Sequence, residues 1–258
     1  MSAAERELCR VLGLRDHEQR SIDRAQKFWS KTSTDALEDG RAHWRYHGVF
    51  ANDDARWLSL GVNNLELFER TAGPGWLEQH GGRIVDWGCG GGSNAIHFGR
   101  HAGRYYGVDI TTSSLRECST QMANAELRNF VPVVIDAARP ELACVEIAEP
   151  VDLVLCTYVF ELIPTKRYGE RMLTVLRALL RDDGYAFIQI KYSDGTWRSM
   201  ARRFGYERSF ANMTTYRIEE FWEIAMKLGL PPQAVVLEPQ QPLVDDRRYA
   251  YFLLRRAS

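Results

Sequence analysis

No stretch of this 258-residue sequence is apolar for the eighteen or so residues that a transmembrane helix needs. The amino-terminal residues, Met-Ser-Ala-Ala-Glu-Arg-Glu, also lack the apolar centre of a signal peptide. We therefore expect no association with a membrane. The predicted location is the cytoplasm.

Cysteine is scarce and scattered along the chain. The five cysteines are an odd number, and no two of them form a C-x-x-C pair. This pattern excludes a disulfide framework and a cysteine zinc site. We expect the cysteines to be reduced thiols, and we expect no metal.

An excess of positive charge is also missing, because the formal net charge is −1 and the pI is about 6.6. Proteins that bind DNA or tRNA usually have a basic face or a high pI. A nucleic-acid partner is therefore not expected, although a local basic patch stays open. The length and the hydrophobic content of 45% suit one α/β domain with an extension.

The most informative stretch is residues 84–92, Ile-Val-Asp-Trp-Gly-Cys-Gly-Gly-Gly. A short apolar run enters Asp86, glycines follow at alternate positions, and a helix-compatible segment comes next. A strand, a glycine turn and a helix form the ligand site of an open α/β sheet. Glycine is needed there because a Cβ atom would keep the backbone away from the ligand. A glycine-rich corner without a ligand remains an alternative.

The spacing of the glycines separates the candidate ligands. The dinucleotide pattern G-x-G-x-x-G would need a glycine at Ser93, and a phosphate loop would need a lysine after the glycines. The observed pattern is Asp-x-Gly-x-Gly-x-Gly. It resembles motif I of the class I, Rossmann-like methyltransferases that use S-adenosylmethionine (SAM).

Three further strands end in residues that suit such a ligand. The predicted strand at residues 104–110 carries Asp109 at its carboxyl end. Asp109 can accept hydrogen bonds from both ribose hydroxyls, as in NAD-binding domains. Asp136 directly follows the predicted strand at residues 131–135, and Cys156 is the last residue of the predicted strand at residues 151–156. Asp109 as a helix cap and Asp136 as the start of a turn are the alternatives.

Four matches in order strengthen the resemblance, which covers about residues 80–258. It implies that Asp136 binds the adenine amino group, that the Ala137 N–H faces a ring nitrogen, and that the Cys156 carbonyl receives the ammonium of SAM. The predicted cofactor is SAM, with S-adenosylhomocysteine (SAH) as its product. The residues that the resemblance places against the cofactor are Asp86, Gly88, Cys89, Gly90, Asp109, Ile110, Asp136, Ala137 and Cys156.

The order of predicted elements supports the same family. From Gly81 onward strands alternate with helices, and the last two strands, 234–238 and 249–254, are joined by a loop. A loop of this kind implies an antiparallel strand, which we expect at the sheet edge. The predicted fold is therefore a doubly wound α/β sheet of seven mostly parallel strands with an antiparallel last strand. Residues 1–80, with short helices at 8–14 and 22–29, are predicted to form a helical extension or lid before a domain at 81–258.

Two segments are candidates for the acceptor site. In residues 43–50, Trp44 and Tyr46 are predicted to cover the cofactor, and His43 or His47 is a candidate base. The insertion at about 194–216 interleaves aromatic residues with arginines, whose planar forks suit an anionic or carbonyl-rich acceptor. Packed histidines and solvated arginines are the alternatives. The candidate acceptor contacts in the insertion are Trp197, Arg202, Arg203 and Tyr206.

Tyr158 and Glu161, just beyond the fourth predicted strand, are candidate catalytic residues that should face the transferred methyl group. Methyltransferases that act on nucleobase amines carry Asn/Asp-Pro-Pro-Tyr/Phe here, whereas this chain has Cys-Thr-Tyr-Val at 156–159. The expected function is methyl transfer to an oxygen or nitrogen atom of a small molecule. The alternatives are a tRNA methyltransferase and a non-catalytic module that binds SAM or a partner. A nicotinamide-dependent oxidoreductase stays formally open, and the sequence does not determine the oligomeric state.

Overall fold

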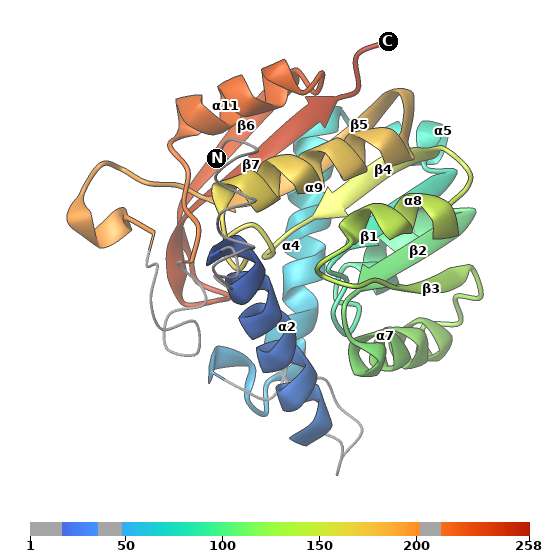
Figure 1. The fold of residues 1–258 in the computed structure, drawn as a ribbon. Helices are drawn as coiled ribbons and strands as arrows, with labels where there is room; N and C mark the ends of the chain where they lie inside the picture. The colour runs from blue at the N-terminus through green and yellow to red at the C-terminus, as the bar shows by residue number, and fades with distance from the viewer. Residues whose placement is uncertain (1–16, 36–47, 202–212) are drawn as a thin grey trace.

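The computed structural model describes residues 17–35, 48–201 and 213–258. Its centre is a seven-stranded sheet in the order β3-β2-β1-β4-β5-β7-β6 (Figure 1). The strands are β1 (Arg83–Trp87), β2 (Arg104–Asp109), β3 (Phe130–Val134), β4 (Val151–Cys156), β5 (Leu180–Lys191), β6 (Pro232–Gln241) and β7 (Asp246–Arg255). Strands β1 to β5 pair in parallel, which confirms the predicted doubly wound sheet.

The last strand, β7, runs antiparallel to both of its neighbours, β5 and β6. The predicted reversal is confirmed, but the predicted position at the edge is wrong, because β6 occupies the edge. The burial of the two strands explains the order. Residues 249–254 of β7 are all buried, whereas β6 is mostly half-exposed. A continuous apolar run is typical of a strand that is covered on both faces.

Helices cover both faces of the sheet. Figure 1 shows α9 and α8 in front of the sheet and α4 behind it. The back layer contains α4 (Asp54–Ala72), α5 (Trp76–His80), α6 (Ala95–Phe98) and α7 (Thr112–Asn124). The front layer contains α2 (His17–Asp35), α8 (Ala143–Glu146), α9 (Lys166–Leu179) and α11 (Ile218–Lys227). Short 3-10 helices lie at Gly48–Phe50 (η2), Gly99–His101 (η3), Pro140–Leu142 (η4) and Trp197–Ser199 (η5).

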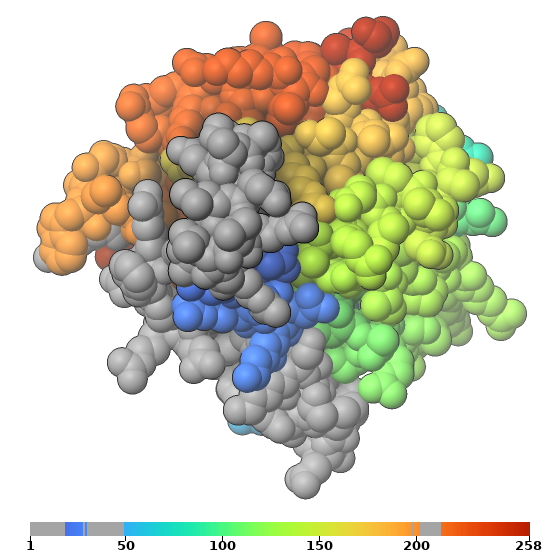
Figure 2. Space-filling model, viewed as in Figure 1, coloured from blue at the N-terminus to red at the C-terminus, as the bar shows by residue number. Residues whose placement is uncertain are grey.

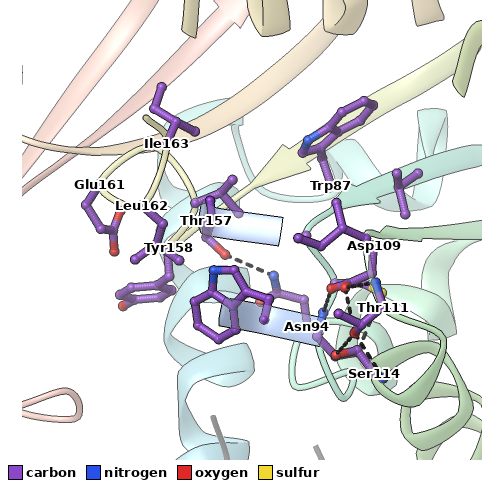
Figure 3. Close-up of a pocket in the computed structure, with 18 of the residues that line it drawn as sticks. Trp87, Asn94, Asp109, Thr111, Ser114, Thr157, Tyr158, Glu161, Leu162 and Ile163 are labelled. Carbon is purple, nitrogen blue, oxygen red and sulfur yellow. Dashed lines mark hydrogen bonds between the residues drawn. The ribbon is translucent and has the colours of Figure 1, made fainter. Parts of the chain in front are cut away.

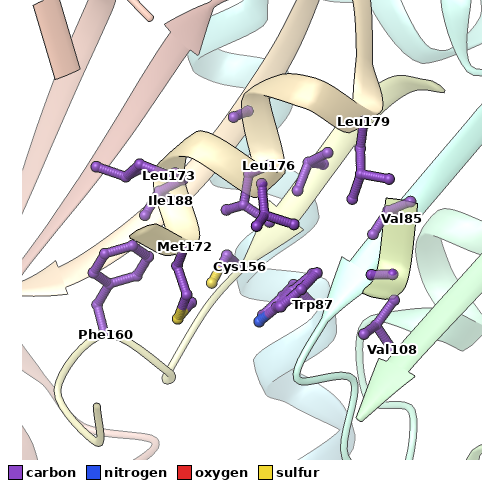
Figure 4. Packing of buried hydrophobic residues seen from close by; sticks show 14 of the residues in the cluster. Val85, Trp87, Val108, Cys156, Phe160, Met172, Leu173, Leu176, Leu179 and Ile188 are labelled. Carbon is purple, nitrogen blue, oxygen red and sulfur yellow. The ribbon is translucent and has the colours of Figure 1, made fainter. Parts of the chain in front are cut away.

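Helix α9 shows how the front layer is stabilised. Its residues Met172, Leu176 and Leu179 recur at helical spacing and are almost fully buried. They pack in one cluster with Val85 and Ile188 of the sheet (Figure 4). Full burial of such a side chain contributes roughly 1.5–3 kcal/mol, so this stripe fixes α9 against the front face of the sheet.

Helix α4 lies before residue 81 and still contributes to the core of the sheet. Its residues Leu67 and Phe68 are 2% and 0% exposed and belong to the cluster on the back face. The predicted helix at 22–29 lies inside α2, and the one at 8–14 lies outside the described residues. The division of the chain at residue 81 into a lid and a catalytic domain stays a prediction.

Candidate active site

A cavity of about 510 Å³ lies at the carboxyl ends of β1, β2, β3 and β4. Ligands of open α/β sheets bind in this place, where the strand order reverses. Figure 3 shows Asp109, Thr111 and Ser114 on one side of the cavity and Tyr158, Glu161 and Leu162 on the other. Further lining comes from α2, η2 and α4. One cavity therefore contains residues that were predicted to bind the cofactor together with Tyr158 and Glu161, the two candidate catalytic residues after β4.

The glycine turn after β1 adopts the left-handed conformation that its sequence predicts. Gly88, Gly90 and Gly92 have φ values of 75°, 52° and 97°. A Cβ atom on Gly88 would lie 2.4 Å from Cγ2 of Val159, which no real contact tolerates. The Gly88 N–H donates to the carbonyl oxygen of Val108 at 2.8 Å. Gly88, Cys89 and Gly90 all line the cavity, and their contact with the cofactor stays a prediction.

Asp109 connects the end of β2 to the glycine turn. Its Oδ2 accepts the Gly90 N–H at 3.1 Å, and its Oδ1 accepts the N–H of Thr111 at 2.9 Å. Thr111 is the residue that caps α7, so the cap alternative for Asp109 does not apply. Burial raises the pKa of Asp109, while its hydrogen bonds oppose that rise. Asp109 and Ile110 both line the cavity, and their contact with the cofactor stays a prediction.

The end of β3 places its two predicted residues differently. Ala137 lines the cavity, whereas Asp136 is not among the lining residues. The Asp136 carboxylate accepts the Ala138 N–H at 2.8 Å and the Arg139 Nε–H at 3.1 Å, and the first of these bonds chiefly lowers its pKa. Asp136 thus forms the turn that was its alternative role. Its contact with adenine stays a prediction.

A buried network of polar side chains lies beneath the cavity. Asp86, which is 1% exposed, accepts the Tyr105 hydroxyl at 2.9 Å and the Asn94 amide at 3.4 Å. Asn94 also donates to Thr157 Oγ1 at 3.1 Å and accepts from Asn64 at 2.9 Å. Burial raises the pKa of Asp86 to about 7, and the bonds from Tyr105 and Asn94 oppose that rise. Asp86 does not line the cavity, whereas its partner Asn94 does, and contact of Asp86 with the cofactor stays a prediction.

Helix α4 contacts the segment after the glycine turn more closely than the sequence predicted. A Cβ atom on Gly61 would lie 1.8 Å from the Ser93 carbonyl oxygen and 2.6 Å from Cδ2 of His97. Only glycine allows this approach. Sequence reasoning missed Gly61, because a lone glycine in a helix usually indicates only a weak helix position.

The end of β4 is strained at the cavity wall. Cys156 is fully buried and does not line the cavity, but Thr157 and Tyr158 do. Tyr158 has a φ of 58°, which is unfavourable for a bulky residue and typical of functional sites. Its N–H donates to Oε1 of Gln189 at 2.5 Å, and its hydroxyl lies 2.9 Å from that of Tyr251. Burial raises the pKa of the Tyr158 hydroxyl, so it stays protonated.

Glu161 presents a buried carboxylate to the cavity. The residue is 3% exposed and lines the cavity, and its backbone carbonyl accepts the N–H of Met213 at 3.0 Å. Its Oε2 has no hydrogen-bond partner among the residues that the structure describes. Burial raises the pKa of Glu161 to about 7, and the charge of Lys191 partly opposes that rise. Near neutral pH the protonated and ionised forms of Glu161 are therefore both populated.

Strands β5 and β7 support this wall from behind. Lys191 is 1% exposed and forms an ion pair with Asp246. Its Nζ lies 5.4 Å from the centre of the Tyr249 ring, and the Tyr249 hydroxyl donates to Oδ2 of Asp246 at 3.1 Å. Asp246 and Tyr249 line the cavity, and sequence reasoning missed both. The one available signal was a lysine at the end of an apolar strand.

The remaining predicted site residues are not part of the described cavity wall. Trp197 is 76% exposed and is not among the lining residues. It belongs to the orange segment that projects from the molecule in Figure 2. Its contact with an acceptor stays a prediction. The other predicted residues lie outside the described residues, namely His43, Trp44, Tyr46, His47, Arg202, Arg203 and Tyr206.

Residues 17–35, 48–201 and 213–258 contain no group of three histidine, cysteine, aspartate or glutamate side chains that could hold a metal ion. No helix in the same residues is long and apolar enough to cross a membrane.

The cavity fits SAM better than a dinucleotide. Its described lining contains three carboxylates and no lysine or arginine, and this excess of negative charge disfavours an anionic pyrophosphate. A ribose diol suits Asp109, and a positive sulfur suits an acidic, apolar cavity. The reversed β7, the glycine turn and Asp109 together define the fold of a class I SAM-dependent methyltransferase.

Comparison with known proteins agrees with this class. Residues 55–234 match the sequence model of a family described as the methyltransferase domain, and the chain therefore belongs to that family. The protein is a SAM-dependent methyltransferase that uses SAM as its cofactor. No curated protein sequence matches the chain.

Solved structures share the fold at low sequence identity. The magnesium protoporphyrin IX methyltransferase of Synechocystis, solved with SAH, is 15% identical, with a TM-score of 0.63 over 92% of this chain and 100% of that one. The 1,6-didemethyltoxoflavin-N1-methyltransferase of Burkholderia thailandensis is 17% identical, with a TM-score of 0.61 over 94% and 90%. The N-methyltransferase NodS of Bradyrhizobium japonicum, also solved with SAH, is 14% identical, with a TM-score of 0.58 over 94% and 100%.

Proposed function

We propose that this enzyme transfers a methyl group from SAM to an oxygen or nitrogen atom of a small molecule. The observation that carries the proposal is the single cavity that runs from Asp109 to Glu161 and Asp246. The end at Asp109 suits the adenosyl group. The end at Glu161 and Asp246 is lined by residues that were not predicted to bind the cofactor, so it is available to an acceptor. The toxoflavin enzyme and NodS, which are similar in fold, are named as N-methyltransferases.

Bound SAM supplies a methyl group that its positive sulfur has already activated. The residues of the chain therefore need to orient the acceptor atom and to exclude water. Asp109 would hold the ribose, Ala137 and Asp136 the adenine, and the Cys156 carbonyl the ammonium group. The glycine turn would lie against the remainder of the cofactor.

The α2 helix supports the proposal of an amino-terminal lid. Its residues Ile22, Ala25 and Trp29 line the cavity from outside the sheet. Figure 2 shows the blue part of α2 at the molecular surface, next to the green central part of the chain. We propose that α2 excludes water from the bound cofactor, and that Trp44, Tyr46 and either His43 or His47 belong to the same cover.

Calorimetry with SAM and SAH, together with a methyl-release assay, tests the proposed function. We expect both ligands to bind and NAD(P)H not to bind. Binding of both without turnover on a broad set of small molecules would instead support the non-catalytic module. A salt-sensitive shift with tRNA, followed by methylation, would support the RNA enzyme.

A further inference from the structure

The charged residues that line the cavity all have the same sign. Within the described residues they are Asp109, Glu161 and Asp246, and no lysine, arginine or histidine joins them. The Asp109 carboxylate already accepts hydrogen bonds from the N–H groups of Gly90 and Thr111. Figure 3 places Glu161 on the side of the cavity opposite Asp109. Within the described residues, Glu161 is therefore the acidic side chain of the acceptor half that no basic side chain pairs with, and a carboxylate there favours a cationic ligand.

The nearest lysine does not neutralise Glu161. Lys191 is buried behind the wall, does not line the cavity and forms its ion pair with Asp246. The side-chain amide of Gln189 lies near Glu161 and lowers its pKa. Nε2 of Gln189 and Oε2 of Glu161 nevertheless both lack a hydrogen-bond partner among the described residues.

Glu161 thus combines deep burial with an unused acceptor atom. The residue is 3% exposed, and no donor in the described part of the chain reaches its Oε2 atom. A buried carboxylate oxygen without a donor is unfavourable. A ligand with an N–H group would supply the missing donor.

We propose that the acceptor is a basic amine that binds as a cation, with Glu161 as the group that takes its proton and Asp246 as a second carboxylate near it. The inference rests on the proposed function, and it selects nitrogen over oxygen as the methylated atom. The rings of Tyr158 and Tyr249 border the same space, and aromatic rings attract ammonium groups.

The proposed reaction is balanced in atoms and charge. The ammonium group of the acceptor first gives one proton to the Glu161 carboxylate. The freed nitrogen lone pair then forms a bond to the methyl carbon, and the carbon–sulfur bond breaks with its electron pair left on sulfur. The methylated ammonium and SAH leave, and Glu161 releases its proton to water. A base with a pKa near neutrality suits this role.

Several groups influence the titration of Glu161. They lie on β5 and β7 as well as on the loop of Glu161 itself. Lys191 favours the carboxylate form, whereas Asp246 disfavours it. The hydroxyls of Tyr158, Tyr249 and Tyr251 are protonated, because burial raises each pKa.

Calorimetry on the full chain saturated with SAH tests the proposal with matched probes. The probes are benzylamine, benzyl alcohol and benzoate, followed by the same three groups on a cyclohexylmethyl skeleton. We expect each amine to bind at least about tenfold more tightly than its partners, and its affinity to rise with pH through about 7.

Two variants locate the effect. Glu161→Gln should weaken amine binding by about tenfold or more and remove its dependence on pH, while SAH binds as before. Glu66→Gln, which changes an exposed glutamate of α4, is the matched control and should leave both affinities unchanged.

The outcomes separate this inference from the proposed function. A failure of SAH to bind would refute the proposed function. With SAH bound, tighter binding of benzoate, no amine binding at millimolar concentration, or amine binding insensitive to Glu161→Gln would each overturn the inference. A selective loss of SAM affinity relative to SAH in Glu161→Gln would overturn it too, since Glu161 would then serve the sulfonium.

Discussion

Gly61→Ala is expected to weaken cofactor binding from a position outside the cavity wall. The added Cβ atom would lie 1.8 Å from the Ser93 carbonyl oxygen, whereas real contacts of this kind are not shorter than 3.0 Å. The backbones of α4 and of the Ser93 segment must therefore move apart by more than 1 Å, roughly, or the helix must bend. Ser93 and Asn94 line the cavity, so this movement distorts the cofactor site.

The expected magnitude follows from two opposing terms. Overpacking costs about 1–3 kcal/mol, and replacing glycine by alanine within a helix returns up to about 1 kcal/mol. The net loss should be about 1–2 kcal/mol of unfolding free energy, or several degrees in Tm for a chain of this size. The displaced turn should also raise the Kd for SAH about tenfold.

Thermal unfolding and calorimetry with SAH measure both effects. Val62→Ala changes the neighbouring residue, which is 40% exposed, and serves as the control that alters α4 without approaching Ser93. A Gly61→Ala variant with the Tm and the SAH affinity of the parent chain would refute the reasoning.

Three further predictions concern the two halves of the site. Asp109→Ala should weaken SAM binding at least about tenfold, or roughly 1.4 kcal/mol; near-normal affinity in calorimetry would show that Asp109 does not hold the ribose. The contribution of Asp86 to the unfolding free energy should fall as the pH rises from 3.8 to about 7, because the folded chain keeps on Asp86 a proton that the unfolded chain releases. Asp86→Asn should reduce that slope in urea titrations, and equal slopes would contradict the raised pKa. Replacing both Arg202 and Arg203 by alanine should raise the KM of an amine acceptor that also carries a carboxylate or carbonyl group, and unchanged kinetics would remove the arginines from the acceptor site.

The cofactor half was predictable because its signals are local in the sequence. A strand, a glycine turn and a helix lie within twenty residues, and Asp109 follows at the next strand end. The carboxyl ends of parallel strands meet at one edge of the sheet, so local patterns determine the arrangement of these residues. Asp136 shows the limit of such patterns, because its side chain is satisfied by its own turn.

The acceptor half was less predictable because its contacts join distant parts of the chain. Lys191 and Asp246 meet only after β7 pairs with β5. Gly61 and Ser93 meet only after α4 packs on the segment that follows the glycine turn. Neither pair has a fixed spacing or a motif that one sequence can reveal. The edge position expected for the last strand was wrong for a similar reason. The order of β6 and β7 depends on which of the two strands is buried on both faces, and no local pattern shows this.

The reversal of β7 has a consequence for how this enzyme could acquire new specificity. Because β7 runs against the other strands, the tip of the β6–β7 hairpin reaches the same end of the sheet as the glycine turn. Val244, Asp246 and Tyr249, which line the cavity, thus come from one short contiguous stretch that holds none of the residues predicted to bind the cofactor. Exchange of that stretch between related enzymes offers a direct route to altered acceptor preference with the donor site left intact.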